Sequence, residues 1–212
     1  MAYAEGSGAN RDEQQSALWL RRSAEAGYPE AEFRVGMMSQ LGLGVAQDPS
    51  GAALWFWRAA ELGQGAAALR LGESYLDGRG LTANFRQALR WFERSGNDPL
   101  ALYYRGLVQE KGLGVAANAN AAFGLYRNAA QKGELRALVK TGMMYMSGVG
   151  VAQDVNTAAK YLHQLGQDGS ADSLNLSAWM LVTDDNEKLR NGKLAATLIK
   201  QAIKAAGPTA QL

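Results

Sequence analysis

The 212-residue chain has no cysteine, one histidine and only four prolines. Without cysteine it cannot form disulfides, zinc–thiolate sites or a cysteine nucleophile. The single histidine, His163, would have to serve any Ser-His-Asp triad, yet no Gly-x-Ser-x-Gly element accompanies it. A metal site around it would need several carboxylates, whereas Asp154 and Asp168 are better explained as a helix cap and a loop residue. We therefore expect no catalytic residue, no metal site and no cofactor, and we interpret His163 as a partly exposed helix residue.

The chain also lacks a concentration of charge and a long apolar run. Its 22 basic and 20 acidic residues are spread along the sequence and leave a net charge of +2, so we expect no binding of nucleic acid. No apolar run approaches the roughly 18 residues that a transmembrane helix needs, so we expect no membrane span. No basic-then-apolar signal segment opens the chain. The compartment stays open, because proteins of the cytosol and of the periplasm can both lack cysteine.

What the chain contains instead is a repeat. The motif Gly-x-Gly followed by Val or Leu begins at Gly42, Gly78, Gly112 and Gly148, at intervals of 36, 34 and 36 residues. A period of this size is typical of stacked-repeat proteins, which offer an extended surface rather than a pocket. The pattern therefore favours partner binding over catalysis. A phosphate-binding loop is a poor alternative, because no strand precedes the motif and no Gly-Lys-Ser follows it.

Each repeat is predicted to form two helices. The first helix carries a small residue where a neighbouring helix must approach closely, and it ends at the first glycine of the motif, where a left-handed residue is favoured. These helix glycines are Gly36, Gly72, Gly106 and Gly142. The second helix begins after an N-cap residue. The predicted N-caps are Asp48, Asn84, Asn118 and Asp154.

The second helices share a stripe of alanine, a bulky residue and alanine at spacings of +3 and +7, which is one apolar face of a helix. The bulky members, which we predict to be core residues, are Trp19, Trp55, Trp91, Leu125 and Tyr161. An aromatic stack that binds sugar is the alternative interpretation. Trp57 lies off the stripe.

These landmarks resemble the Sel-one-like repeat family, a relative of the tetratricopeptide repeats. The matching segments are LGLGVAQDPSGAALWFWRAAELG, LDGRGLTANFRQALRWFERSG, KGLGVAANANAAFGLYRNAAQKG and SGVGVAQDVNTAAKYLHQLGQDG. The resemblance implies an all-α fold, a right-handed superhelical solenoid of antiparallel helix pairs in which the first helices line the concave face. It also implies a role in assembling protein complexes, often in bacterial envelopes or in signalling.

The whole chain, residues 1–212, is interpreted as one repeat domain with atypical ends. The predicted units are a partial repeat at 1–30, repeats at 31–66, 67–100, 101–136 and 137–172, and a degenerate C-terminal helix pair at 173–212. In the last unit Asp184-Asp185-Asn186 replaces the glycine turn, and Ala195, Leu198 and Ala202 keep the stripe. We interpret the acidic pair as a turn rather than a pair of catalytic carboxylates. Because the partial repeat at 1–30 begins at the end of a first helix, we hypothesise that Met1 is an engineered start in a longer protein. A natural half-repeat cap is the alternative.

The candidate partner-binding residues lie on the first helices. In a tetratricopeptide-like frame, the positions three before and one after each helix glycine face the concave groove. They are Phe33, Met37, Leu69, Glu73, Tyr103, Leu107, Val139 and Met143. Seven of these eight are apolar, which suits protein recognition. The alternative is packing within the repeat, because a frame error of one residue moves a side chain about 100° around the helix.

The sequence thus predicts a non-enzymatic scaffold or adaptor that binds a protein or peptide, as a monomer or in a partner-dependent assembly. An adaptor of the bacterial cell envelope and an immunity-type protein that neutralises a toxic effector are two narrower versions, and the periplasm is slightly favoured over the cytoplasm. A module that binds peptidoglycan or another polysaccharide through Trp57 or Tyr103 is an alternative of a different class. Catalysis is a further alternative, and it would need a convergent polar cluster that the repeat pattern does not show.

Overall fold

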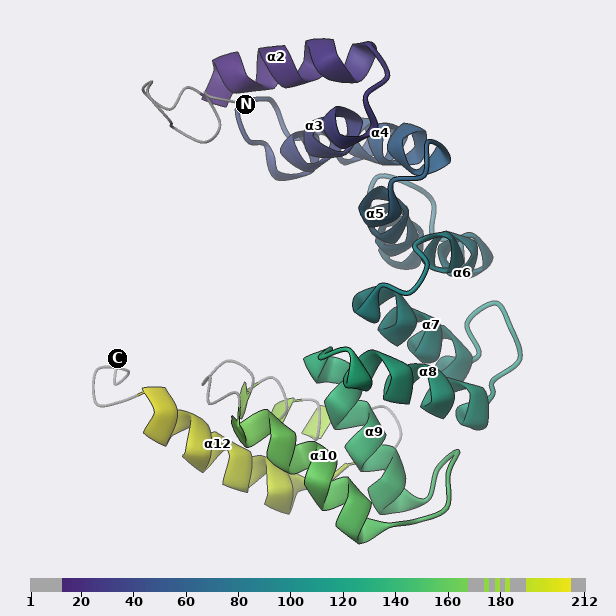
Figure 1. The fold of residues 1–212 in the computed structure, drawn as a ribbon, viewed down its shortest axis with the longest axis vertical. Helices are drawn as coiled ribbons and strands as arrows, with labels where there is room; N and C mark the ends of the chain where they lie inside the picture. The colour runs from purple at the N-terminus through teal and green to yellow at the C-terminus, as the bar shows by residue number, and fades with distance from the viewer. Residues whose placement is uncertain (1–12, 168–173, 176–177, 180–181, 184–189, 207–212) are drawn as a thin grey trace. The chain divides into compact units, whose positions relative to one another are not determined.

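The computed structural model describes residues 13–167, 174–175, 178–179, 182–183 and 190–206, and every regular element in these ranges is an α-helix (Figure 1). The prediction of an all-α fold is confirmed. The chain divides into two compact units, Met1–Ala101 and Leu102–Leu212. Asp168 and the Asp184-Asp185-Asn186 segment lie outside the described residues.

The first unit holds five helices in the described residues and the start of a sixth. They are α2 (Glu13–Glu25), α3 (Pro29–Leu41), α4 (Pro49–Glu61), α5 (Gly65–Asp77), α6 (Phe85–Arg94) and the first turn of α7 (Pro99–Lys111). Helix α3 packs against α2 and α4, and α5 packs against α4 and α6 (Figure 1). Each of these first helices therefore lies between two second helices, one from its own repeat and one from the preceding repeat.

The second unit continues the same alternation. After α7 come α8 (Ala119–Gln131), α9 (Leu135–Ser147), α10 (Val155–Gln167) and α12 (Gly192–Ala206). Helix α9 packs against α8 and α10. In α12 the predicted stripe is buried, because Ala195, Leu198 and Ala202 are all less than 5% exposed. His163 lies in α10, and its side chain is outside the described part of the structure.

The Gly-x-Gly motif ends the first helices as predicted. Gly42 is the C-cap of α3 with a left-handed φ of 73°, and its N–H donates to the carbonyl of Met38 at 2.8 Å. The same bond runs from Gly148 to Met144 at the end of α9. A residue with a Cβ is disfavoured in this conformation, which explains why glycine recurs at this position.

All four predicted N-caps are confirmed. Each side-chain oxygen accepts a hydrogen bond from the backbone N–H three residues later, at 2.9 to 3.1 Å, in the order Asp48, Asn84, Asn118 and Asp154. Asp154 also accepts a bond from the hydroxyl of Thr157, and this bond is the largest reason that the pKa of Asp154 is lowered. The caps satisfy N–H groups that have no partner inside the helix.

Removal of one cap tests this account. We expect Asn118→Ala to lower the free energy of unfolding by about 1 kcal/mol, because the N–H of Ala121 loses its acceptor. Urea unfolding followed by circular dichroism measures the change. Asn128→Ala, an exposed change later in the same helix, is the control and is expected to be neutral or slightly stabilising. Equal losses in both variants would contradict the capping role.

Helix glycines allow the two helices of a repeat to approach closely. A Cβ placed on Gly36 would lie 2.6 Å from the ring of Phe56, and one on Gly106 would lie 2.6 Å from the ring of Tyr126. Gly72 and Phe92 form the same pair in the repeat between them. The predicted packing reason is therefore confirmed at these three glycines. The aromatic rings are completely buried.

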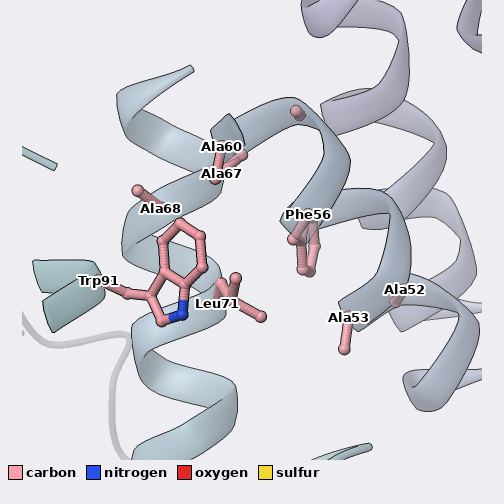
Figure 2. Close-up of a cluster of buried hydrophobic side chains, with 9 residues drawn as sticks. Ala52, Ala53, Phe56, Ala60, Ala67, Ala68, Leu71 and Trp91 are labelled. Carbon is pink, nitrogen blue, oxygen red and sulfur yellow. The ribbon is translucent and has the colours of Figure 1, made fainter. Parts of the chain in front are cut away.

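This packing corrects the predicted core stripe. The alanines are buried, and Trp91 is 7% exposed, but Trp19 is 52% exposed, so the core prediction is wrong at Trp19. Trp55, Leu125 and Tyr161 are half-buried. In α4, α6 and α8 the deepest aromatic residue is the next one along, as at Phe56, because its ring fits over the glycine of the first helix. Figure 2 shows Phe56 in a cluster with Leu71, Trp91 and alanines such as Ala52 and Ala53.

Candidate functional site

The structure buries half of the predicted partner-binding residues. Leu69, Tyr103, Val139 and Met143 are each at most 8% exposed, so these side chains do not offer an open surface. Phe33, Met37, Glu73 and Leu107 are half-buried and present part of their surface to solvent. The expectation that all eight residues face an open groove is corrected, while their role in partner binding stays a prediction.

The burial follows from the rotation of residues around a helix. Three residues before the helix glycine, the side chain points toward the second helix of its own repeat: the ring of Phe33 lies 6.0 Å from that of Phe56, and the ring of Tyr103 lies 5.6 Å from that of Tyr126. One residue further along, a helix turns by about 100°. Arg34 and Tyr104 are accordingly half-exposed. The predicted position three before the glycine is therefore one residue too early, whereas the position one after the glycine is partly open at Met37, Glu73 and Leu107.

In the first unit, the half-exposed residues of α3 and α5 combine a methionine with paired charges. Arg34 Nε lies 2.7 Å from Glu30 Oε1, and Arg70 Nη1 lies 2.9 Å from Glu73 Oε2. Gln64, the N-cap of α5, donates to Glu30 Oε2 at 2.8 Å and links the two helices. We call Arg34, Met37, Arg70 and Glu73 the first-helix surface of this unit. Long side chains with apolar stems and charged ends are well suited to contact a protein.

In the second unit, the corresponding register is open on α7 and closed on α9. Tyr104 and Leu107 are half-exposed. On α9, Lys140 is only 6% exposed in its side chain and lies 3.1 Å from Glu110 Oε2. Tyr126 donates its hydroxyl to the same carboxylate at 2.7 Å. A buried pair with its hydrogen bonds satisfied is a structural contact rather than a free binding group.

The second helices also carry stacked pairs of tryptophan and arginine, which were not predicted from the sequence. In three second helices, an arginine three residues after a tryptophan lies over its ring, with the guanidinium carbon 4.5 to 4.8 Å from the ring centroid. The pairs are Trp19–Arg22, Trp55–Arg58 and Trp91–Arg94. In the case of Trp19, which is 52% exposed, the stacked guanidinium of Arg22 covers one face of the ring. The Trp-x-x-Arg spacing was visible in the sequence and could have indicated these pairs.

A pocket of about 300 Å³ opens in the first unit between α2, α3 and α4. Most of its lining residues are small or apolar, and the others are one arginine and one aspartate. The lining residues are Ala17, Arg21, Val35, Met38, Ser39, Val45, Ala46, Asp48, Gly51 and Trp55. The repeat pattern predicts an extended surface and no pocket, because it does not show where neighbouring helices leave a space.

The alternative sites considered from the sequence have little support among the described residues. Trp57 is 46% exposed on α4 and is accessible to a ligand, whereas the burial of Tyr103 removes it from the proposed polysaccharide site. Among the described residues, no three His, Cys, Asp or Glu side chains are placed to hold a metal ion together. No helix in this part of the chain is long and apolar enough to cross a membrane.

The helix pairs with glycine C-caps have a counterpart among known families. The family model for the Sel1 repeat matches residues 1–28, 29–64, 65–97, 99–134 and 135–170. The chain belongs to the Sel1 repeat family. Proteins built from Sel1 repeats generally mediate protein–protein interactions, and the repeat is generally a non-catalytic fold. A comparison with curated proteins gives no match.

Solved structures of Sel1 repeat proteins have the same fold. A Sel1 repeat protein from Oxalobacter formigenes is 24% identical, with a TM-score of 0.80 over 95% of this chain and 81% of that protein. The protective antigen c5321 of uropathogenic Escherichia coli is 25% identical, with a TM-score of 0.79 over 95% of this chain. This chain spans 43% of the length of c5321. The immunity protein Pa5087 from Pseudomonas aeruginosa is 18% identical, with a TM-score of 0.52 over 85% of this chain and 67% of that protein.

Proposed function

We propose that the chain is a non-enzymatic interaction scaffold that binds a protein or a peptide through its first helices. The observation that supports this most directly is the first-helix surface of the first unit. There Met37 lies half-exposed in α3, on the same helix as Arg34, while Arg70 and Glu73 occupy the corresponding places in α5. A flexible apolar side chain among charged groups suits a partner with one apolar anchor and a polar rim.

The paired charges give this surface its selectivity. Both ion pairs are at least partly exposed, so each contributes little to folding stability in water. A partner that covers them would remove solvent and strengthen their interactions with its own charges. The proposed contact in the first unit therefore consists of Met37 as the anchor and Arg34, Arg70 and Glu73 as the rim. Phe33 and Met37 both pack against the core cluster of Phe56 and its neighbours. In the second unit, Leu107 and Tyr104 are the accessible residues of the same kind.

A photo-crosslinking experiment followed by affinity measurement tests this proposal. A photoreactive amino acid at position 37 is expected to capture a protein in the native cells, whereas the same amino acid at position 54, which is 59% exposed on α4, is not. With that protein purified, Met37→Glu is expected to weaken binding by at least about tenfold, because a charge replaces the apolar anchor.

Leu54→Glu is the matched control for the affinity measurement, since it places the same charge on a second helix of the same unit. Its affinity for the partner is expected to equal that of the wild type. If Met37→Glu binds normally while Leu54→Glu binds poorly, the first-helix surface is the wrong face.

An immunity-type role is the second candidate, and its support is the shared fold with the immunity protein Pa5087. In that case the partner is a toxic protein, and the same first-helix surface would cover it. Co-expression with a toxic protein encoded beside the gene is expected to restore growth. Growth that stays arrested when both proteins are present would exclude this role for that pair.

A further inference from the structure

The pocket between α2, α3 and α4 has a filled counterpart in the second unit. With the repeat register, Ala17, Ser39 and Trp55 of the pocket correspond to Phe123, Tyr145 and Tyr161. Those three rings pack together: Phe123 and Tyr145 meet edge to face with centroids 5.1 Å apart, and Tyr145 stacks on Tyr161 at 5.8 Å.

Two of the three rings are absent from the pocket. Alanine replaces the ring of Phe123, and serine replaces the ring of Tyr145, while an aromatic residue remains as Trp55. The repeat that follows in the first unit also has tyrosine at the serine position. This residue is Tyr75, which packs against the core cluster of α4 and α5. The repeat at 101–136 has Gln109 at this position, so the aromatic residue is found in two of the three other full repeats. The space in the pocket therefore corresponds to the space that a tyrosine side chain occupies in those two repeats.

The size and lining of the pocket suit a single aromatic ring. An apolar cavity of about 150 Å³ is known to hold benzene, so a pocket of about 300 Å³ has room for a ring and the first carbon of a side chain. Val35, Met38 and Val45 offer apolar contact, and Trp55 offers a surface for stacking.

The polar groups on the wall favour tyrosine over phenylalanine. Asp48 lines the pocket, and its Oδ1 accepts the N–H of Gly51 as the cap of α4. A carboxylate has about four acceptor sites, so the same group can also accept a phenol hydroxyl. Arg21, which pairs with Glu25 at 3.1 Å, is a second polar group on the wall.

We propose that this pocket receives a tyrosine side chain from the protein partner. The inference rests on the proposed function, since it assumes a protein partner, and it adds a second contact site to the first-helix surface. The partner's ring takes the place that Tyr145 holds in the second unit. It contacts Trp55 and fills the space beside the small side chains of Ala17 and Ser39.

The first test uses p-cresol, the side-chain analogue of tyrosine, with no partner present. In NMR spectra of the wild-type protein, p-cresol is expected to shift the signals of Ser39, Gly51 and the Trp55 indole. Ser39→Tyr, which introduces the residue found at this position as Tyr75 and Tyr145, is expected to weaken p-cresol binding by at least about tenfold without lowering the melting temperature. Ala17→Phe is a second variant that fills the pocket from the opposite wall. Ala66→Tyr adds a ring at an exposed site on α5 and is expected to bind p-cresol as the wild type does.

Several results would overturn the inference. If p-cresol shifts no signal in the wild type, the pocket does not hold a ring. The same conclusion follows if Ser39→Tyr and Ala17→Phe bind p-cresol as tightly as the wild type does. Tighter binding of toluene than of p-cresol means that tyrosine is the wrong residue. Self-association in sedimentation equilibrium that Ser39→Tyr abolishes means that a second copy fills the pocket, for example with its exposed Tyr28.

The final arm uses the crosslinked partner in purified form. Ser39→Tyr is expected to weaken partner binding by at least about tenfold, and unchanged affinity would overturn the pocket as a partner contact. Failure of the pocket is distinguishable from failure of the first-helix surface. If Ser39→Tyr weakens binding and Met37→Glu does not, the pocket stands and the first-helix surface is wrong.

Discussion

Replacement of Phe56 by alanine is expected to lower the free energy of unfolding by about 3–5 kcal/mol. Phe56 is completely buried, its ring lies against the backbone at Gly36, and it contacts the ring of Phe33. Alanine would remove this apolar contact and leave a cavity, because Gly36 has no side chain to fill it. Gly36 thus leaves the space that the ring of Phe56 occupies, and the packing of the two helices depends on that ring to fill it.

The loss can be measured by urea unfolding with tryptophan fluorescence. Four of the five tryptophans, Trp19, Trp55, Trp57 and Trp91, lie in the first unit, so this signal mainly reports the unit that holds Phe56. Phe85→Ala is the matched control, because Phe85 begins α6 and is 36% exposed. It is expected to lose less than about 1.5 kcal/mol, since an exposed side chain leaves no cavity. Similar losses in the two variants would show that Phe56 is not a core residue.

The second large effect is expected at Gly80, the second glycine of its motif. Gly80 has a left-handed φ of 76°, and a Cβ there would overlap the carbonyl group of Pro49 at the start of α4. Gly80→Ala therefore combines backbone strain of about 1–2 kcal/mol with a steric clash of about 1–3 kcal/mol. The expected total is about 3 kcal/mol in the free energy of unfolding.

Gly63→Ala separates these two causes. Gly63 has a φ of 89°, and a Cβ there would meet nothing within 4 Å. This control is expected to show the strain alone, with a loss of about 1–2 kcal/mol. Equal losses in the free energy of unfolding for Gly80→Ala and Gly63→Ala would contradict the close contact between Gly80 and the start of α4 in the preceding repeat.

Local features of this fold were predictable because their causes lie within a few residues of each other. An N-cap such as Asn118 bonds to an N–H three residues away, and a C-cap such as Gly42 bonds to a carbonyl four residues back. These contacts depend on residue type and spacing alone. The repeated glycines added a longer-range prediction, because only close packing against another helix explains a glycine such as Gly36 inside a helix.

The candidate site was less predictable because it depends on the rotation of each helix about its axis. Tyr103 was expected in a groove and is buried against Tyr126, while its neighbour Tyr104 is half-exposed. Trp19 was expected in the core and is exposed under Arg22. An error of one position turns a side chain by about 100°, which is enough to exchange core and surface.

The sequence by itself determined that this protein is a helical repeat, where its first helices end and its second helices begin, and which glycines bring two helices together. These properties follow from hydrogen bonds and contacts that recur with the repeat. Only the tertiary structure decided which side chains remain open to a partner, since exposure depends on what three neighbouring helices place around a residue. The pocket at Ser39 belongs to this second kind of property, because it exists only where α2, α3 and α4 meet and two rings found in the other unit are missing.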